Sequence, residues 1–231
     1  MSTAQPAATI GSIIDVAINS AFDETRLAAY LTGRIVDFSG PMRVQQFEGG
    51  QSNPTFLLST PDHRYVLRRK PAGVLLKSAH AVDREYRITM ALHEAGLPVA
   101  EPLLLCEDED VIGSIFYVMR YVPGRSFWDP RMPGLDRAER AAIYDSANET
   151  LARLHLVDFA SLGLGDYGKP GNYFARQISR WSRQYDASRT RNIPEMDRLI
   201  DWLPSAIPVT EERTTIIHGD YSFHNLLVHP T

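Results

Sequence analysis

The sequence contains very little cysteine, since Cys106 is the one cysteine among its 231 residues. A chain with a single thiol forms no internal disulfide and no cysteine-based zinc site. Such a composition is typical of a reducing compartment. Stability must therefore come from a buried core, and a chain of 26.0 kDa is long enough to form one without cross-links.

The sequence also lacks an excess of positive charge. Lys and Arg together number 24 against 28 for Asp and Glu, which gives a formal net charge of −4. General binders of nucleic acid or of anionic membranes carry the opposite balance. No run approaches the ~18 apolar residues that cross a bilayer, and residues 1–9 show no charged segment followed by an apolar one, as a signal peptide would. We expect a cytoplasmic protein that binds neither nucleic acid nor membrane.

What the sequence does contain is a change of hydrophobic pattern near its middle. Short apolar runs between turn residues predict strands at 44–48, 55–59, 65–69, 103–107 and 114–121, with a helix at 79–95. Asp23 is expected to cap a shorter helix before them. Beyond Pro123 and Gly124 a helical period prevails, at 136–157, 173–185 and 196–207, and residues 214–217 and 226–228 are expected to form a short strand pair. This pattern predicts an α+β fold with a β-rich N-terminal lobe over 1–121 and a helical C-terminal lobe over 122–231.

The segment from His218 to Asn225, which reads HGDYSFHN, carries the clearest chemistry. Asp220 and Asn225 are five residues apart, and a loop can turn both side chains toward one point. A carboxylate there can accept a proton from a hydroxyl group. An amide oxygen beside it can hold a hard cation such as Mg²⁺, which takes a few oxygen ligands together with phosphate and water.

The spacing His-x-Asp-x-x-x-x-Asn is also that of the kinase catalytic loop. With Gly219 in place of the arginine of protein kinases, the segment resembles aminoglycoside phosphotransferase-like small-molecule kinases, over about residues 43–230. The resemblance implies a two-lobed, protein-kinase-like fold with ATP and Mg²⁺ as cofactors and a small-molecule hydroxyl as acceptor. Asp220 would orient and deprotonate that hydroxyl, Asn225 would hold Mg²⁺, and His218 would brace the loop.

The same resemblance implies several nucleotide-binding parts in the first lobe. A phosphate-covering loop is expected between the first two strands, where Gly49, Gly50, Gln51, Ser52 and Asn53 stand, although an ordinary hairpin turn is the alternative there. At the hinge between the lobes, Met119 would precede the residues that bind adenine, and the backbone groups of Arg120 and Val122 would bind it.

A phosphate-binding cation is expected on the third strand and a carboxylate partner on the next helix. Arg68 takes the cation's place after the Val-Leu pair, and Lys70, on the same strand face, is a reserve. Glu85 shares a helical stripe with the apolar side chains of Ile88 and Leu92. A carboxylate in such a stripe is costly unless it is paired, so we expect an ion pair between Arg68 and Glu85. The alternatives are a solvated strand end and an exposed glutamate.

Residues 168–173, which read GKPGNY, and the arginine-rich stretch that follows resemble the branch of these kinases associated with acyl-CoA dehydrogenases. This resemblance implies an association with such dehydrogenases and a hydroxyacyl-type acceptor. The arginines at 176–183 would then meet an anionic group of the substrate, or alternatively form a solvated helix face.

Two alternatives to an active kinase remain open. Relatives of this type carry a second metal-binding Asp beyond the catalytic loop, and no acidic residue follows Asp220 up to Thr231. We therefore expect either a fragment of a longer protein or a nucleotide-binding module that is catalytically incompetent. The second alternative is a metal-dependent hydrolase built on His218, Asp220, His224 and His229.

Overall fold

The computed structural model of the chain describes residues 13–17, 21–48, 53–71, 82–169, 171–208 and 214–230. These residues fall into two units, which are described separately. One comprises Met1–Leu156 and Ile217–Thr231, and the other comprises Val157–Ile216. The expected lobe boundary after residue 121 lies inside the first unit, so the division into 1–121 and 122–231 stays a prediction.

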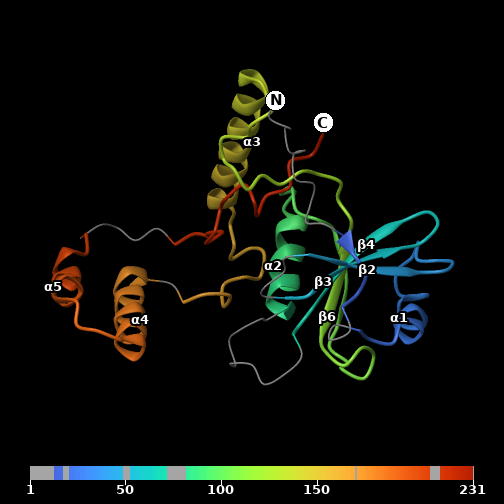
Figure 1. Cartoon of the computed structure of the whole chain (residues 1–231), viewed down its shortest axis with the longest axis horizontal. Coiled ribbons are helices and arrows are strands. Elements are labelled where there is room, and N and C mark those ends of the chain that lie inside the picture. The colour runs from blue at the N-terminus through green and yellow to red at the C-terminus, as the bar shows by residue number, and fades with distance from the viewer. Residues whose placement is uncertain are drawn as a thin grey trace. The chain divides into compact units, whose positions relative to one another are not determined.

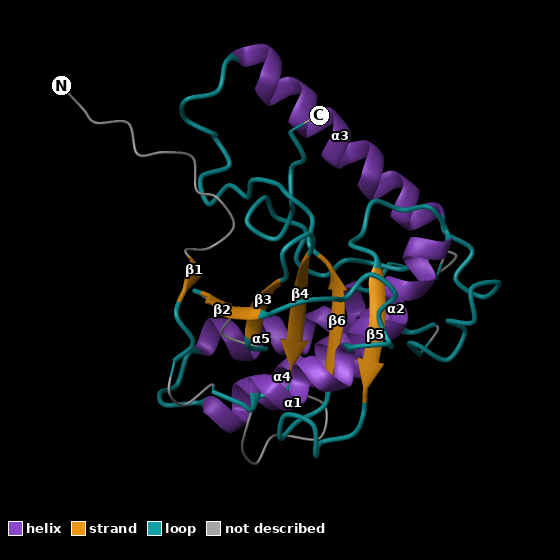
Figure 2. Ribbon diagram, turned by 90° about the vertical axis from the view of Figure 1, so that its right-hand side faces the viewer, coloured by secondary structure: helices purple, strands orange, loops and turns teal. Residues whose placement is uncertain are grey.

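An antiparallel sheet forms the centre of the first unit (Figure 1). Its described strands are β1 (Ile13–Ile14), β2 (Arg43–Phe47), β3 (Thr55–Ser59), β4 (Arg64–Arg69), β5 (Pro102–Cys106) and β6 (Phe116–Arg120). They lie in the order β1-β2-β3-β4-β6-β5. Figure 2 shows the arrows of β4, β6 and β5 pointing in alternating directions. The predicted strands at 44–48, 55–59, 65–69, 103–107 and 114–121 are confirmed to within two residues, whereas the two-residue β1 was not predicted.

One face of this sheet is covered by helix α1 (Glu24–Leu31). The side chain of Asp23 accepts a hydrogen bond from the Arg26 N–H at 2.9 Å, which confirms the predicted cap. Leu27 and Leu31 of this helix are completely buried. They pack in one core with residues of alternate positions on the central strands, namely Phe56, Leu58, Tyr65, Leu67, Phe116 and Val118.

The opposite face carries a smaller apolar cluster and the second helix. Phe47, Leu57 and Val66 are buried there, with Met119 and Tyr121 packed against them. Helix α2 (Val82–Glu94) packs against β5 and β6. It ends, as expected, before Gly96, whose φ of +72° lies in the left-handed region. Residues 79–81 of the predicted helix lie outside the described residues.

The remaining helices also follow the sequence pattern. Helix α3 (Arg137–Leu156) begins with a capping box, in which the Glu139 N–H donates to Asp136 and the Asp136 N–H donates to Glu139. The second unit holds α4 (Tyr173–Ser188), α5 (Pro194–Trp202) and the 3₁₀ turn η2 (Leu203–Ala206). None of the helices in the described part of the chain combines the length and apolar character that a bilayer crossing requires.

The predicted strand pair between 214–217 and 226–228 is wrong. Residues 214–217 form no strand, and Val228 instead makes an antiparallel bridge with Arg125. The Arg125 N–H donates to the Val228 carbonyl at 2.9 Å, and the Val228 N–H donates back at 2.8 Å. The apolar run therefore has a strand-like conformation, but its partner lies about a hundred residues away, and no local pattern indicates such a partner.

Replacing Leu67 by Ala should lower the free energy of unfolding by about 2–5 kcal/mol, because the side chain is completely buried and its removal leaves a cavity. Leu156, which is 68% exposed, provides the control. Its replacement by Ala should change stability by no more than about 0.5 kcal/mol. Urea unfolding of both variants measures the difference. Equal midpoints would contradict the assignment of Leu67 to the core.

Candidate active site

Arg68 and Glu85 form the ion pair that the sequence predicts. Arg68 Nε donates to Glu85 Oε2 at 3.0 Å, and its Nη2 lies 3.4 Å from Oε1. Arg68 comes from β4 and Glu85 from α2, so the pair joins helix to sheet. The two side chains are 31% and 36% exposed. The guanidinium is therefore held in place and still accessible to a ligand such as a phosphate group.

Two further donors, Asn53 and Tyr117, hold the same carboxylate. Asn53 Nδ2 donates to Glu85 Oε1 at 2.8 Å, and the Tyr117 hydroxyl donates to Oε2 at 3.3 Å. Arg68 and Tyr117 are cross-strand partners of β4 and β6, so their side chains emerge from one face of the sheet. We call Asn53, Arg68, Glu85 and Tyr117 the Glu85 cluster. Because each carboxylate oxygen accepts from two donors, the orientation of Glu85 is fixed.

Tyr117 is almost completely buried, at 4% exposure. Burial raises the pKa of its hydroxyl far above the ordinary value, the charge of Arg68 opposes this rise, and Glu85 adds to it. The hydroxyl is therefore protonated at neutral pH and remains a donor to Glu85. Tyr117 was not singled out from the sequence. Period-two alternation along β6 places it on the face of Met119, and this signal was available.

If the Glu85 cluster is the nucleotide site that the sequence predicts, replacing Tyr117 by Phe should lower kcat/KM for the nucleotide about fivefold, because one hydrogen bond that orients Glu85 is lost at a cost of about 1 kcal/mol. The ring itself remains, so the core is not disturbed. Tyr86 provides a matched control, since its ring packs edge-on against that of Tyr117. Tyr86→Phe should leave the kinetics unchanged. Identical effects of the two substitutions would show that the Tyr117 hydroxyl has no part in positioning Glu85.

Of the other residues predicted to bind nucleotide, the structure describes some and not others. Gly49, Gly50, Gln51 and Ser52 lie outside the described residues. Asn53 is described, but its side chain is buried and directed to Glu85. The Lys70 N–H donates to the Ile115 carbonyl at 3.0 Å. The role of its ammonium group as a reserve cation stays a prediction.

Of the predicted hinge residues, Met119 lies on the face of the sheet that carries the smaller apolar cluster. Met119 packs beside Val66, its cross-strand partner, in the smaller apolar cluster. These apolar side chains lie on the same face of the sheet as Arg68, the face on which the nucleobase is predicted to bind. The Arg120 N–H donates to the Glu101 carbonyl at 2.8 Å, so this donor is occupied within the sheet. Adenine binding by the Arg120 carbonyl and by Val122 stays a prediction.

The predicted catalytic loop, residues 218–225, brings Asp220 and Asn225 together as expected. Asn225 Nδ2 donates to Asp220 Oδ2 at 2.7 Å and to the Asp220 carbonyl at 3.1 Å. The Ser222 hydroxyl donates to Asp220 Oδ1 at 3.3 Å. Because the amide nitrogen of Asn225 faces Asp220, its amide oxygen is the atom left for a cation. The donor set fits one side of a magnesium site, although no group of three or more His, Cys, Asp or Glu side chains gathers in a metal-binding arrangement among the described residues.

Contacts with distant segments hold this loop in place. The Phe127 N–H donates to the Phe223 carbonyl at 3.0 Å, and the Tyr221 hydroxyl donates to the Ala147 carbonyl of α3 at 2.7 Å. The close approach also needs Gly124, where a Cβ atom would lie 3.2 Å from the Val228 carbonyl oxygen. The segment that follows the predicted hinge and helix α3 therefore determine where Asp220 lies.

Gly219 and His218 shape the start of the loop. Gly219 has a φ of +85°, which an arginine or any other L side chain adopts only with strain. His218 Nδ1 accepts from the Asp220 N–H at 3.4 Å, and its ring meets the edge of Tyr221 at 5.4 Å. These are the contacts expected of a side chain that braces the loop.

In the second unit, the arginines of α4 have local partners. Arg176 donates to the carbonyls of Gly171 and Lys169, and Arg183 Nε donates to the Ser179 carbonyl at 3.2 Å. Arg180 lies over the Trp181 ring at 5.6 Å. Contact of this helix with an anionic substrate stays a prediction.

Known proteins resemble the chain in both sequence and structure. A family model described as the phosphotransferase enzyme family, APH, matches residues 43–231. The chain is 47% identical to acyl-CoA dehydrogenase family member 10 of Mus musculus and 48% identical to family member 11 of Gallus gallus. Both matches cover 91% of this chain, but only 20% and 27% of the relatives, so the chain spans about a quarter or less of their length.

Solved structures extend the comparison. A crystal structure from Ralstonia eutropha JMP134, provisionally assigned as an aminoglycoside phosphotransferase, superposes with a TM-score of 0.82. It is 51% identical, and the match covers 91% of this chain and 62% of that one. Aminoglycoside-3′-phosphotransferase of type VIII superposes with a TM-score of 0.56 at 17% identity, over 83% of this chain and 68% of that one, and shows similarity of fold alone. The chain therefore belongs to the APH phosphotransferase enzyme family and has its α+β, protein-kinase-like fold.

Proposed function

We propose that this chain transfers the terminal phosphoryl group of ATP to a hydroxyl group of a small molecule. The observation that carries the proposal is the Glu85 cluster, in which a guanidinium on the nucleotide face of the sheet is oriented by a carboxylate with four donor contacts. Phosphoryl transfer depends chiefly on positioning and on neutralising phosphate charge. An oriented, accessible guanidinium beside an apolar surface meets both needs for a nucleotide.

Each of the candidate site residues has a separate role in this reaction. Arg68 holds phosphate oxygens, and the apolar surface of Val66 and Met119 holds the base. Asp220 accepts the proton of the acceptor hydroxyl as the new O–P bond forms and the bond to ADP breaks. Asn225 offers its amide oxygen to Mg²⁺, which, when bound, neutralises charge on the phosphates. His218 keeps the loop in position.

The named relatives favour a particular class of acceptor. They are acyl-CoA dehydrogenase family members, and the matched segment is a part of each of those longer proteins. A kinase joined to such a dehydrogenase would serve its chemistry by phosphorylating a hydroxyacyl compound, because phosphate turns a hydroxyl into a good leaving group. We therefore propose a hydroxyacyl-type acceptor and an association with acyl-CoA dehydrogenases.

The test is transfer of labelled phosphate from γ-labelled ATP, with Mg²⁺, to a panel of hydroxyacyl-CoA esters, free hydroxy acids and aminoglycosides. Label is expected in a hydroxyacyl product, and EDTA should abolish the transfer. Binding of nucleotide without transfer to any acceptor would instead support the nucleotide-binding module that does not turn over. Hydrolysis of a compound of the panel in the absence of ATP, with a requirement for bound zinc or iron, would support the hydrolase alternative. Absence of nucleotide binding would overturn the proposal.

A further inference from the structure

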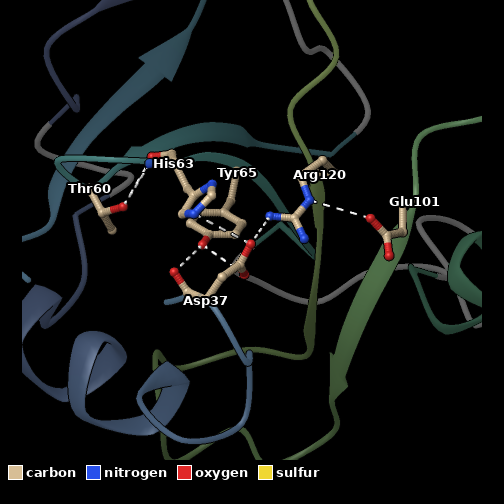
Figure 3. A network of polar contacts seen from close by, with 6 residues as sticks. All are labelled: Asp37, Thr60, His63, Tyr65, Glu101 and Arg120. Atoms are coloured by element: carbon tan, nitrogen blue, oxygen red, sulfur yellow. Dashed lines mark hydrogen bonds and ion pairs between the residues drawn. The ribbon is translucent and has the colours of Figure 1, made fainter. Parts of the chain in front are cut away.

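Tyr65 and Arg120 are cross-strand partners on the face of the sheet opposite to that of Arg68. They belong to a second group of polar and charged side chains, which Figure 3 shows. Arg120 Nη1 donates to Asp37 Oδ2 at 2.6 Å, and Arg120 Nε donates to Glu101 Oε2 at 3.3 Å. The Tyr65 hydroxyl donates to Asp37 Oδ1 at 3.1 Å and to the Asp37 carbonyl at 3.0 Å. His63 Nε2 lies 3.7 Å from Asp37 Oδ2. One guanidinium thus joins two carboxylates that come from distant parts of the chain.

Arg120 occupies a particular place in the fold, because it is the last residue of β6 and stands two residues before Val122. Its backbone N–H donates to the Glu101 carbonyl at 2.8 Å, while its side chain binds the carboxylate of the same residue. The next N–H, of Tyr121, donates to the Arg64 carbonyl at 3.1 Å. The chain is therefore anchored at Arg120 and Tyr121, up to the residue before Val122.

Asp37 comes from a segment that the family match, residues 43–231, does not include. This segment is nevertheless firmly packed, since Leu31, Ile35 and Phe38 around Asp37 are buried in the main core. The position of Asp37 is therefore fixed by its buried neighbours, so that its carboxylate can in turn hold Arg120 in place. The segment that precedes the family domain is thus an integral part of the nucleotide-binding sheet.

The protonation states agree with this geometry. Burial opposes the ionisation of Asp37, but hydrogen bonds from Arg120 and Tyr65 outweigh it and keep the pKa of the carboxyl below its ordinary value. Burial, with the neighbouring Asp37 adding to it, raises the pKa of Tyr65 to about 12. At neutral pH the carboxylate is charged and the hydroxyl remains a donor, so the contacts of Asp37 with Arg120 and Tyr65 are made.

We propose that Asp37, Arg120 and Glu101 form a hinge brace, a set of positioning residues that holds the backbone of residues 120–122 where it binds the nucleobase. The inference rests on the proposed nucleotide-dependent function and deepens it. Two anchors stand at the point where β6 ends and where, among the described residues, the register with β4 stops at Arg120. Asp37 restrains the strand end from the side of α1, and Glu101 restrains it from the start of β5.

The brace is tested by Asp37→Asn, which keeps the shape of the side chain and an acceptor for Tyr65 but removes its charge. The Kd of the non-hydrolysable analogue Mg²⁺·AMP-PNP, measured by calorimetry, should rise about tenfold, which corresponds to a loss of about 1.4 kcal/mol of binding free energy. The KM for ATP should rise in parallel while kcat is retained, a split that loss of folded protein would not produce. Arg198→Met, which breaks the exposed ion pair with Glu195, is the control and should change neither value.

Unchanged affinity in folded Asp37→Asn would overturn the brace. If that variant does not fold, Glu101→Gln provides the same test, because Glu101 is the more exposed arm at 46%. A wild-type chain that binds no nucleotide would overturn the proposed function, and the role of the brace with it. Wild-type binding with unaltered binding by both variants would overturn the brace alone.

Discussion

Replacing Asp220 by Asn is expected to lower kcat by about 10²–10⁴-fold, the usual contribution of a general base. The substitution keeps the shape of the side chain, which Asn225 and Ser222 contact at 2.7 and 3.3 Å. An amide, however, cannot accept the proton of the acceptor hydroxyl. Nucleotide affinity should remain close to that of the wild type, because the Glu85 cluster is untouched. Steady-state kinetics and calorimetry measure the two quantities separately.

Asp201→Asn is the matched control for this experiment, since Asp201 is an exposed residue of α5. It should leave kcat unchanged. Full activity of Asp220→Asn would show that the catalytic loop has been assigned the wrong chemistry. Loss of nucleotide binding together with turnover would indicate a structural role for the carboxylate in place of proton transfer.

Replacing Arg68 by Met should raise the Kd of Mg²⁺·ATP about 10- to 100-fold. The expected loss of binding free energy is that of a hydrogen bond between charged groups, about 1.5–3 kcal/mol. The substitution removes the cation that binds the phosphates, and it leaves Glu85 with only two neutral donors. The Kd of Arg68→Lys should lie between those of the wild type and Arg68→Met. An ammonium group keeps the charge but cannot make both contacts with the two carboxylate oxygens.

Arg131→Met is the charge-matched control for Arg68. Arg131 makes an ion pair with Asp129 at 2.8 Å, but its side chain is 86% exposed. Its removal should not affect nucleotide binding. If Arg68→Met binds nucleotide as tightly as the control, the phosphate-binding cation lies elsewhere, and Lys70 on the same strand face becomes the first residue to test.

Much of the fold could be predicted because its signals are local. Strand β3 was predicted with its observed bounds, since a short continuous apolar run between turn residues defines it almost completely. The pair of Arg68 and Glu85 was also predictable, because a carboxylate in an apolar stripe demands a partner and the preceding strand offers a cation on one face. The convergence of Asp220 and Asn225 followed from the length of one short loop.

What the sequence did not indicate depends on contacts between distant segments. Asn53 was expected to lie in the phosphate-covering loop, yet its side chain is buried on Glu85, 32 residues away. Arg120 was singled out for its backbone, whereas its side chain binds Asp37, 83 residues away. The bridge between Arg125 and Val228 replaced an expected local strand pair. No period of two or 3.6 residues carries information about such partners.

Calorimetric titration of the wild type, Asp220→Asn and Arg68→Met with Mg²⁺·AMP-PNP, side by side, tests the central claim most directly. The claim is that nucleotide affinity depends on Arg68 of the Glu85 cluster and does not depend on the carboxylate of Asp220, which acts in the transfer step. It predicts similar Kd values for the wild type and Asp220→Asn, and a Kd about 10- to 100-fold higher for Arg68→Met. Equal binding by all three proteins, or no binding by the wild type, would contradict it.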